Sequence, residues 1–182
     1  MTDSTRHEDL LKDYDCLHDA ATVERAIDRV AAEINRSLHD QDVLALCVLH
    51  GGLIFAGHVL TRLDFSVALD YIHATRYRGA TIGDELHWIA NPRTALAGRQ
   101  ILLLDDIFDE GLTLHALHKH CLAQGATRVY TAVLAEKDHP RAKADYRPDF
   151  VGLTVEDRYV FGMGMDYKHR LRNVHGIYAV RD

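Results

Sequence analysis

The sequence contains few cysteines, few prolines and no long hydrophobic run. Only three of its 182 residues are cysteine and three are proline. The three cysteines, Cys16, Cys47 and Cys121, are odd in number and lack metal-like spacing. Because Cys47 lies in an apolar run and Cys121 in a predicted helix, we expect these two to be small buried residues in a reducing compartment. No apolar run reaches membrane-spanning length, and the polar N-terminus is unlike a signal peptide. These absences predict a cytoplasmic protein with no membrane partner.

The chain is also short of positive charge. Lys and Arg number 21 against 27 Asp and Glu, which gives a formal net charge of −6. Because a nucleic-acid partner requires a basic surface, this balance argues against one. Repeats, low-complexity segments and Pro/Gly-rich linkers are absent as well. We therefore expect a single domain spanning residues 1–182.

Buried-strand runs alternate with helical patterns along most of the chain. Helices are predicted over 23–34, 53–63 and 113–124, and strands over 43–49, 65–74, from 101, and over 129–134. This alternation predicts an α/β fold with a doubly wound, mainly parallel sheet, occupying about residues 20–147. After Pro148 the pattern changes to short strand-like pieces over 150–155, 158–161 and 177–180. We expect these to form a small hood subdomain over about 148–182, together with N-terminal residues.

The most informative segment is ILLLDDIFDEGLTL at 101–114. Its apolar run predicts a strand buried on both faces that delivers Asp105 and Asp106 to its end. Asp109 follows within a turn, and Gly111 and Thr113 then open a helix. Carboxylates in this position can hold a divalent cation and sugar hydroxyls, and the N–H groups at a helix start bind phosphate. The segment therefore indicates phosphoribosyl chemistry, although a plain acidic turn is the alternative.

This segment closely resembles the phosphoribosyl pyrophosphate (PRPP) motif of type I phosphoribosyltransferases, which have a Rossmann-like sheet. The resemblance implies that Asp105 and Asp106 hold the ribose hydroxyls, directly or through the waters of Mg²⁺, and that Asp109 is the catalytic base for purine N7. The implied ribose and phosphate site also includes Glu110, Gly111, Leu112 and Thr113. Glu110 stands where the family usually has Thr. Because a carboxylate cannot donate to phosphate at neutral pH, we expect Glu110 to point outward.

Two further segments match the same family pattern. His50 and Gly51 resemble the pyrophosphate loop, with His50 in place of the family's Lys. The paired glycines at 51–52 permit backbone conformations with positive φ and the close approach of an anion. Arg76 and Tyr77 lie in a polar segment over 75–92 and resemble the start of the flexible loop that closes over the ribose. A simple turn and a solvated loop are the respective alternatives.

The remaining matches concern the base. Lys137 resembles the Lys that donates to O6 in the branch specific for 6-oxopurines, a role suited to an ammonium because it only donates. Residues 157–167 resemble the hood of hypoxanthine-guanine phosphoribosyltransferases. That resemblance implies that Tyr159 stacks on the purine, the Val160 backbone reads its edge and Asp166 lies near the pyrophosphate-side magnesium. Arg172 resembles the Arg that contacts pyrophosphate, as a bidentate guanidinium can.

The resemblance implies transfer of the phosphoribosyl group from PRPP to N9 of hypoxanthine or guanine, with Mg²⁺, in a homodimer or homotetramer. Two other classes remain open: a related enzyme that uses xanthine or uracil, and an RNA-binding regulator on the same scaffold. No side chain decides among bases that differ at C2. The histidines at 115, 118 and 120 predict an exposed or half-buried helix face rather than a metal site.

Overall fold

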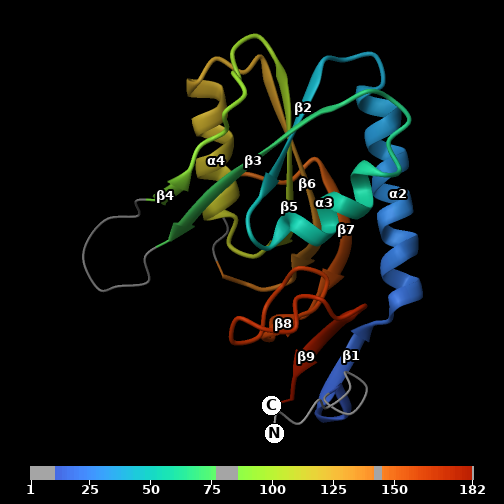
Figure 1. Ribbon diagram of the computed structural model, residues 1–182. Coiled ribbons are helices and arrows are strands. Elements are labelled where there is room, and N and C mark those ends of the chain that lie inside the picture. Colours follow the sequence, from blue (N-terminus) through green and yellow to red (C-terminus); the bar gives the residue numbers. More distant parts are fainter. Residues whose placement is uncertain (1–10, 77–85, 142–144, 182) are drawn as a thin grey trace, which may run out of the picture.

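The computed structural model describes residues 11–76, 86–141 and 145–181 (Figure 1). Its main feature is a six-stranded sheet in the order β4-β3-β2-β5-β6-β7, accompanied by a three-stranded sheet in the order β1-β9-β8. Parallel pairing joins β3, β2, β5, β6 and β7, and only β4 runs antiparallel to its neighbour. No helix in the described ranges is long and apolar enough to cross a membrane.

The main sheet is built from β2 (Val43–Val48), β3 (Ala68–Arg76), β4 (Leu86–Ala90), β5 (Gln100–Phe108), β6 (Arg128–Lys137) and β7 (Phe150–Val155). The helices are α2 (Ala20–Leu38), α3 (Gly52–Leu60) and α4 (Leu112–Ala123), preceded by a short 3-10 helix η1 (Leu11–Asp13). The small sheet contains β1 (Tyr14–His18), β8 (Val160–Phe161) and β9 (Ile177–Val180).

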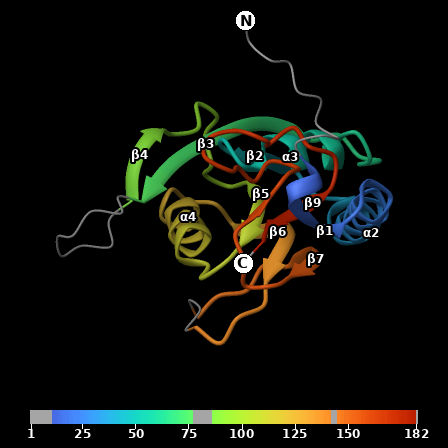
Figure 2. The ribbon, with the colours of Figure 1, turned by 90° about the horizontal axis from the view of Figure 1, so that it is seen from below.

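Helices cover both faces of the main sheet. Seen from below, α2 and α3 lie on one side of the strands and α4 lies on the other (Figure 2). Side chains of β5 alternate between the two cores: Leu102 and Leu104 pack with α2 and α3, whereas Ile101 and Leu103 pack with α4. This is the period-two alternation of a strand buried on both faces. The doubly wound, mainly parallel α/β fold expected from the sequence is confirmed.

Helix α2 has the amphipathic form that its sequence predicts. Its buried residues recur at helical spacing, and Asp19 caps its N-terminus by accepting a hydrogen bond of 2.8 Å from the backbone N–H of Thr22. The three cysteines are free thiols, of which Cys47 and Cys121 are buried. The expected burial of Cys47 and Cys121 is therefore confirmed, and Cys16 on β1 is exposed.

Residues 75–92 are not a continuous polar loop. The strand β4 pairs antiparallel with β3, with His73 opposite Ala90 and Arg76 opposite Leu86. Trp88 holds this strand against α4, since the centroid of its ring lies 4.2 Å from that of His120. Arg76 is the last residue of β3, and Tyr77, the other residue expected in a flexible loop, lies outside the described residues.

The segment over 150–155 belongs to the main sheet, not to the hood as the sequence pattern suggested. It pairs parallel with β6 along its length, from Phe150 opposite Ala132 to Val155 opposite Lys137. Apolar side chains such as Val155 join the core beneath α2, which holds the strand against the sheet. The small sheet of β1, β9 and β8 is the hood, and it lies beyond the carboxyl ends of β5 and β6 (Figure 1).

Candidate active site

Two adjacent carboxylates lie on β5 near its carboxyl end. Asp105 and Asp106 are 9% and 8% exposed, and the backbone N–H of Asp106 donates to Oδ1 of Asp105 over 2.9 Å. Burial raises the pKa of Asp105 well above its usual range, and the charge of Asp106 raises it further. Burial also raises the pKa of Asp106, an effect that Asp105 and Arg172 oppose. Such a buried acidic pair favours a cation or hydroxyl donors as partners.

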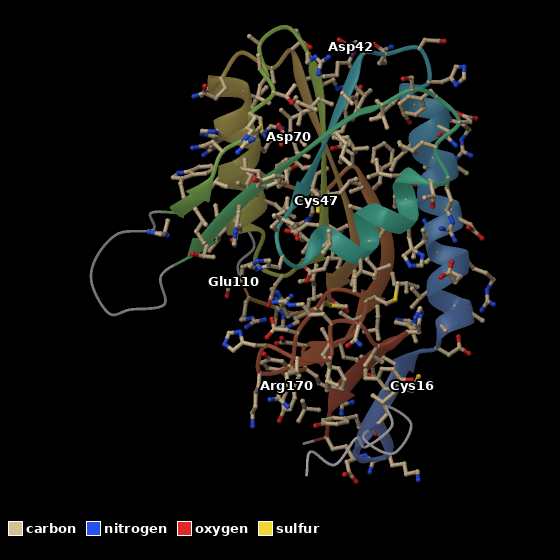
Figure 3. All side chains as sticks on the ribbon, viewed as in Figure 1. Cys16, Asp42, Cys47, Asp70, Glu110 and Arg170 are labelled. Carbon is tan, nitrogen blue, oxygen red and sulfur yellow. The ribbon has the colours of Figure 1, made fainter. Side chains whose placement is uncertain are left out.

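The turn after β5 leads directly into α4. Gly111 precedes the helix with φ +77°, and a Cβ there would collide with the Phe108 ring. A cavity of about 590 Å³ opens at this helix start and is lined in part by Asp105, Asp106, Asp109, Glu110, Gly111, Leu112 and Thr113. Figure 3 shows Glu110 at the end of the sheet nearest the hood. Backbone N–H groups at a helix start and paired carboxylates thus share one cavity, which suits a sugar phosphate.

A second cavity of about 550 Å³ lies between the sheet and the hood. It is lined by Asp106, Ile107, Asp109, Lys137, Arg141, Asp157, Arg158, Tyr159, Val160, Met165 and Asp166. Tyr159 is 54% exposed, whereas Val160 on β8 is buried. The cavity therefore combines an accessible aromatic ring with backbone groups of the hood. It is lined by Lys137, Tyr159 and Val160, which were predicted to contact the base, and by Asp166. Asp106, Asp109 and Arg141 line both cavities.

Asp109 stands among three basic side chains at the junction of the two cavities. Its Oδ2 lies 3.2 Å from Nζ of Lys137, and its Oδ1 lies 3.0 Å from Arg141 and 2.8 Å from Nε2 of His139. Burial alone would raise the pKa of Asp109, but the charges of Lys137 and Arg141 and the contact with His139 outweigh it and lower that pKa. Asp109 is therefore ionised at neutral pH and faces its surroundings as a hydrogen-bond acceptor.

Three residues of this cluster were not found by sequence reasoning. Besides His139 and Arg141, Asp157 of the hood accepts a hydrogen bond of 2.8 Å from Arg141. Lys137 is the last residue of β6, because this strand extends to residue 137 and not only to residue 134 as predicted. The charged residues over 136–141 could have indicated a functional segment. Their role depends on contacts with Asp109 and Asp157, which are distant in the sequence.

The loop at 49–52 packs against the acidic pair. Gly51 has φ −57°, so it does not use the positive φ that glycine permits; the loop needs glycine because a Cβ at residue 51 would collide with the Asp106 carboxylate. His50 is exposed, and its ring centroid lies 4.5 Å from that of His73. Burial lowers the pKa of His73, and the neighbouring His50 lowers it further.

The hood places its own cation beside this loop. The Arg172 guanidinium donates to Oδ1 of Asp166 over 2.7 Å and to the backbone oxygen of Gly164. Oδ2 of Asp166 accepts from the backbone N–H of His169 over 2.8 Å. Arg172, Gly164 and His50 line a third cavity of about 380 Å³, so two of the three residues predicted to contact pyrophosphate share one cavity.

The histidines of α4 do not form a metal centre. The rings of His115 and His118 pack against Tyr146, at centroid distances of 5.4 and 4.9 Å, and His120 packs on Trp88. The half-buried helix face expected from the sequence is confirmed. Within the described ranges, no group of three or more His, Cys, Asp or Glu side chains is arranged to hold a metal ion.

The chain is similar to known proteins over most of its length. The family model described as "Phosphoribosyl transferase domain" matches residues 13–170. The chain is 33% identical to the hypoxanthine-guanine phosphoribosyltransferase of Bacillus subtilis over 84% of each protein. It is 29% identical to the hypoxanthine-guanine-xanthine phosphoribosyltransferase of Tritrichomonas foetus, over 96% of this chain and 93% of that protein.

Solved structures show the same fold. A hypoxanthine phosphoribosyltransferase from Staphylococcus aureus superposes with a TM-score of 0.90 at 21% identity, covering 97% of each chain. A hypoxanthine-guanine-xanthine phosphoribosyltransferase superposes with a TM-score of 0.82 at 27% identity, covering 94% of this chain and 97% of that one. The similarity therefore extends over the sheet, its helices and the hood.

Proposed function

This chain belongs to the phosphoribosyl transferase domain family, and we propose that it transfers the 5-phosphoribosyl group of PRPP to N9 of hypoxanthine or guanine. The products are IMP or GMP and pyrophosphate, and the reaction serves purine salvage. Relatives from several bacteria that carry the name hypoxanthine-guanine phosphoribosyltransferase, at 25–33% identity, support this activity.

The observation that carries the proposal is the pairing of Lys137 with Asp109. An ammonium that only donates and a carboxylate that only accepts lie 3.2 Å apart in the cavity that also contains Tyr159. A 6-oxopurine protonated at N7 presents the complementary pair, the O6 acceptor beside the N7–H donor, on a single edge. Adenine presents an amino group instead of O6, which would face Lys137 with a second donor. The pair therefore selects a 6-oxopurine.

The hood holds the purine ring in this proposal. Tyr159 stacks on one face of the base, and backbone groups of Val160 read its edge. Arg172 contacts pyrophosphate together with His50, which lines the same cavity, and with Gly51, which packs against Asp106.

The phosphoribosyl group occupies the cavity at the start of α4. Its 5′-phosphate accepts hydrogen bonds from the backbone N–H groups after Asp109 and from the Thr113 hydroxyl. The buried pair Asp105 and Asp106 receives the ribose hydroxyls.

The buried acidic pair also fits Mg²⁺, which prefers oxygen ligands and keeps several waters. Asp105 and Asp106 would hold the ion partly through water, and Asp166 would face it from the hood. The described residues offer no group of three metal-ligating side chains, so substrate oxygens must supply much of the coordination. When bound, the ion supplies charge neutralisation of the departing pyrophosphate.

The residues of the chain divide the chemical work. Departure of pyrophosphate leaves positive charge at C1 of the ribose, as in glycoside cleavage. Asp109 accepts the proton from purine N7, which releases the electron pair with which N9 attacks C1. Lys137 donates to O6, where negative charge develops as N7 loses its proton.

The experiment that tests this proposal is a nucleotide-formation assay with PRPP and Mg²⁺ against hypoxanthine, guanine, xanthine, adenine and uracil. We expect turnover of hypoxanthine or guanine, no turnover of adenine, and loss of activity on chelation. The variant Lys137→Gln should lose part of the preference for hypoxanthine over adenine, because an amide both donates and accepts. Turnover confined to uracil would contradict the account of the hood, and turnover of none of the five bases would contradict the function.

Assembly and location are the finer parts of the proposal. We expect a homodimer or homotetramer, supported by the exposed apolar residues Leu53, Leu69 and Tyr71 on α3 and β3. Light scattering on the eluting protein measures this directly. A cytoplasmic location stays a prediction, supported by three free cysteines that suit a reducing compartment.

A further inference from the structure

The two oxygens of the Asp109 carboxylate have different surroundings. Oδ2 lies 3.2 Å from Lys137, which the proposed function assigns to O6 of the base. Oδ1 lies on the other side, 2.8 Å from Nε2 of His139 and 3.0 Å from Arg141. When Lys137 turns to the base, Oδ2 becomes the acceptor for N7–H, while Oδ1 keeps its own partners. The orientation of the carboxylate then depends on what holds Oδ1.

The two partners of Oδ1 differ in how firmly they are held. The Arg141 side chain is 46% exposed and also binds Asp157 of the hood. The His139 side chain is 0% exposed. A long exposed side chain that is shared between two carboxylates holds each of them weakly, because fixing it costs conformational entropy and water screens its charge. A buried imidazole ring has less freedom to move and therefore fixes the position of its partner better.

His139 has no well-aligned hydrogen bond in the free protein. Its Nε2 makes a close contact with Oδ1 of Asp109, and neither ring nitrogen is otherwise hydrogen-bonded within the described part of the chain. Burying an unsatisfied polar ring costs free energy, so a ring kept at this position should gain a partner during function. Catalytic hydrogen bonds are commonly poorly aligned before substrate binds and tighten in the complex.

We propose that His139 is a positioning residue for Asp109: its Nε2–H holds Oδ1 and so directs Oδ2 toward purine N7. This inference rests on the proposed function and adds to it a residue that does not touch the substrate. The charged and titratable groups that face the carboxylate are Lys137 from β6, His139 and Arg141 from the segment after it, and, through Arg141, Asp157 from the hood.

The test compares His139→Phe, which fills the same space without a donor, with His139→Gln, whose amide can still donate to Oδ1. In His139→Phe we expect kcat to fall by roughly 10- to 100-fold, because small misplacements of a catalytic group have effects of this size. KM for PRPP should stay near the wild-type value, and His139→Gln should recover most of kcat. The matched control is His120→Phe, a half-buried histidine on α4 that packs on Trp88 away from both cavities.

Loss of the donor also removes one contact that favours the ionised carboxylate, so the pKa of Asp109 should rise in His139→Phe. Carboxyl-carbon NMR titration of the free protein measures that pKa without requiring activity, and the acid limb of the kcat profile should move in the same direction. Near-native kcat in His139→Phe, or equal losses in the Phe and Gln variants with an unmoved Asp109 pKa, would overturn the positioning role. A wild-type protein that turns over none of the bases would instead refute the proposed function.

Discussion

The ammonium of Lys137 lies 3.2 Å from Oδ2 of Asp109, and both side chains line the cavity beneath the hood. In the free protein this contact keeps the carboxylate ionised and the two charges balanced. A base that carries an acceptor beside a donor can insert between them and satisfy both groups. One pair of side chains therefore accounts for base choice and for proton removal.

The first prediction concerns the proton acceptor. Asp109→Asn keeps the shape of the side chain but removes its basicity, so we expect kcat to fall by about 10²- to 10⁴-fold, the usual contribution of general-base catalysis. Binding of PRPP should survive, because Asp105 and Asp106 remain. Steady-state kinetics with hypoxanthine separate kcat from the KM for PRPP. Near-native turnover would remove Asp109 from the role of base.

The second prediction concerns the missing charge in the pyrophosphate loop. His50 is exposed and stands where the family usually has Lys. A hydrogen bond from a charged donor is stronger than one from a neutral donor by roughly 1 kcal/mol, which corresponds to about a fivefold change in binding. We expect His50→Lys, which places a permanently charged donor at this position, to lower the KM for PRPP by about this factor. An unchanged KM in His50→Lys would show that His50 does not contact pyrophosphate.

The third prediction links stability to metal and substrate binding. Burial raises the pKa of Asp106 above its ordinary 3.8, so the folded protein holds that proton more tightly than the unfolded chain does. The stability of the folded state therefore falls as pH rises from 3.8 through the folded pKa. At pH 7, Asp106→Asn should melt at a higher temperature than the wild-type protein without ligands, and this difference should shrink toward pH 4.

The same substitution should abolish the rise in melting temperature that PRPP with Mg²⁺ gives the wild-type protein, and chelation should abolish that rise in the wild type. Differential scanning fluorimetry measures all of these. A lower melting temperature for the variant at pH 7 would contradict the destabilising effect of the buried Asp106 charge. A full rise in melting temperature with PRPP and Mg²⁺ in the variant would contradict the role of Asp106 in binding them.

Local sequence predicted the elements of the fold better than their arrangement. Helix α2 and strand β5 were predictable because helical periodicity and an unbroken apolar run have few alternative explanations. Strand β7 was assigned to the hood because it is one of the short strand-like pieces that follow Pro148. Only its long-range pairing with β6 places it in the main sheet. Strand β4 was missed for the same reason, since its pairing with β3 is what defines it.

The candidate site divides in the same way. Residues 105–113 form one contiguous segment, so a motif could place them together. His139 and Asp157 surround Asp109 only because β6 and the hood bring separate segments to the end of β5. No spacing in the sequence encodes that proximity.

The last prediction uses two glycines next to and within α3. A Cβ at Gly51 would collide with the Asp106 carboxylate, whereas a Cβ at Gly57 would meet no atom within 4 Å outside its own helix backbone. We expect Gly51→Ala to destabilise the fold by about 1–3 kcal/mol, as overpacking does, and to weaken PRPP binding by displacing Asp106.

Gly57→Ala is the matched control, because it makes the same chemical change inside the helix that Gly51 precedes. It should stabilise the protein by about 0.5–1 kcal/mol, since Ala loses less backbone entropy than Gly in a helix, and it should leave kinetics unchanged. Urea unfolding of both variants gives the two free energies. Equal changes in the free energy of unfolding for the two variants would show that the loop at 49–52 does not require glycine at position 51 for its packing against Asp106.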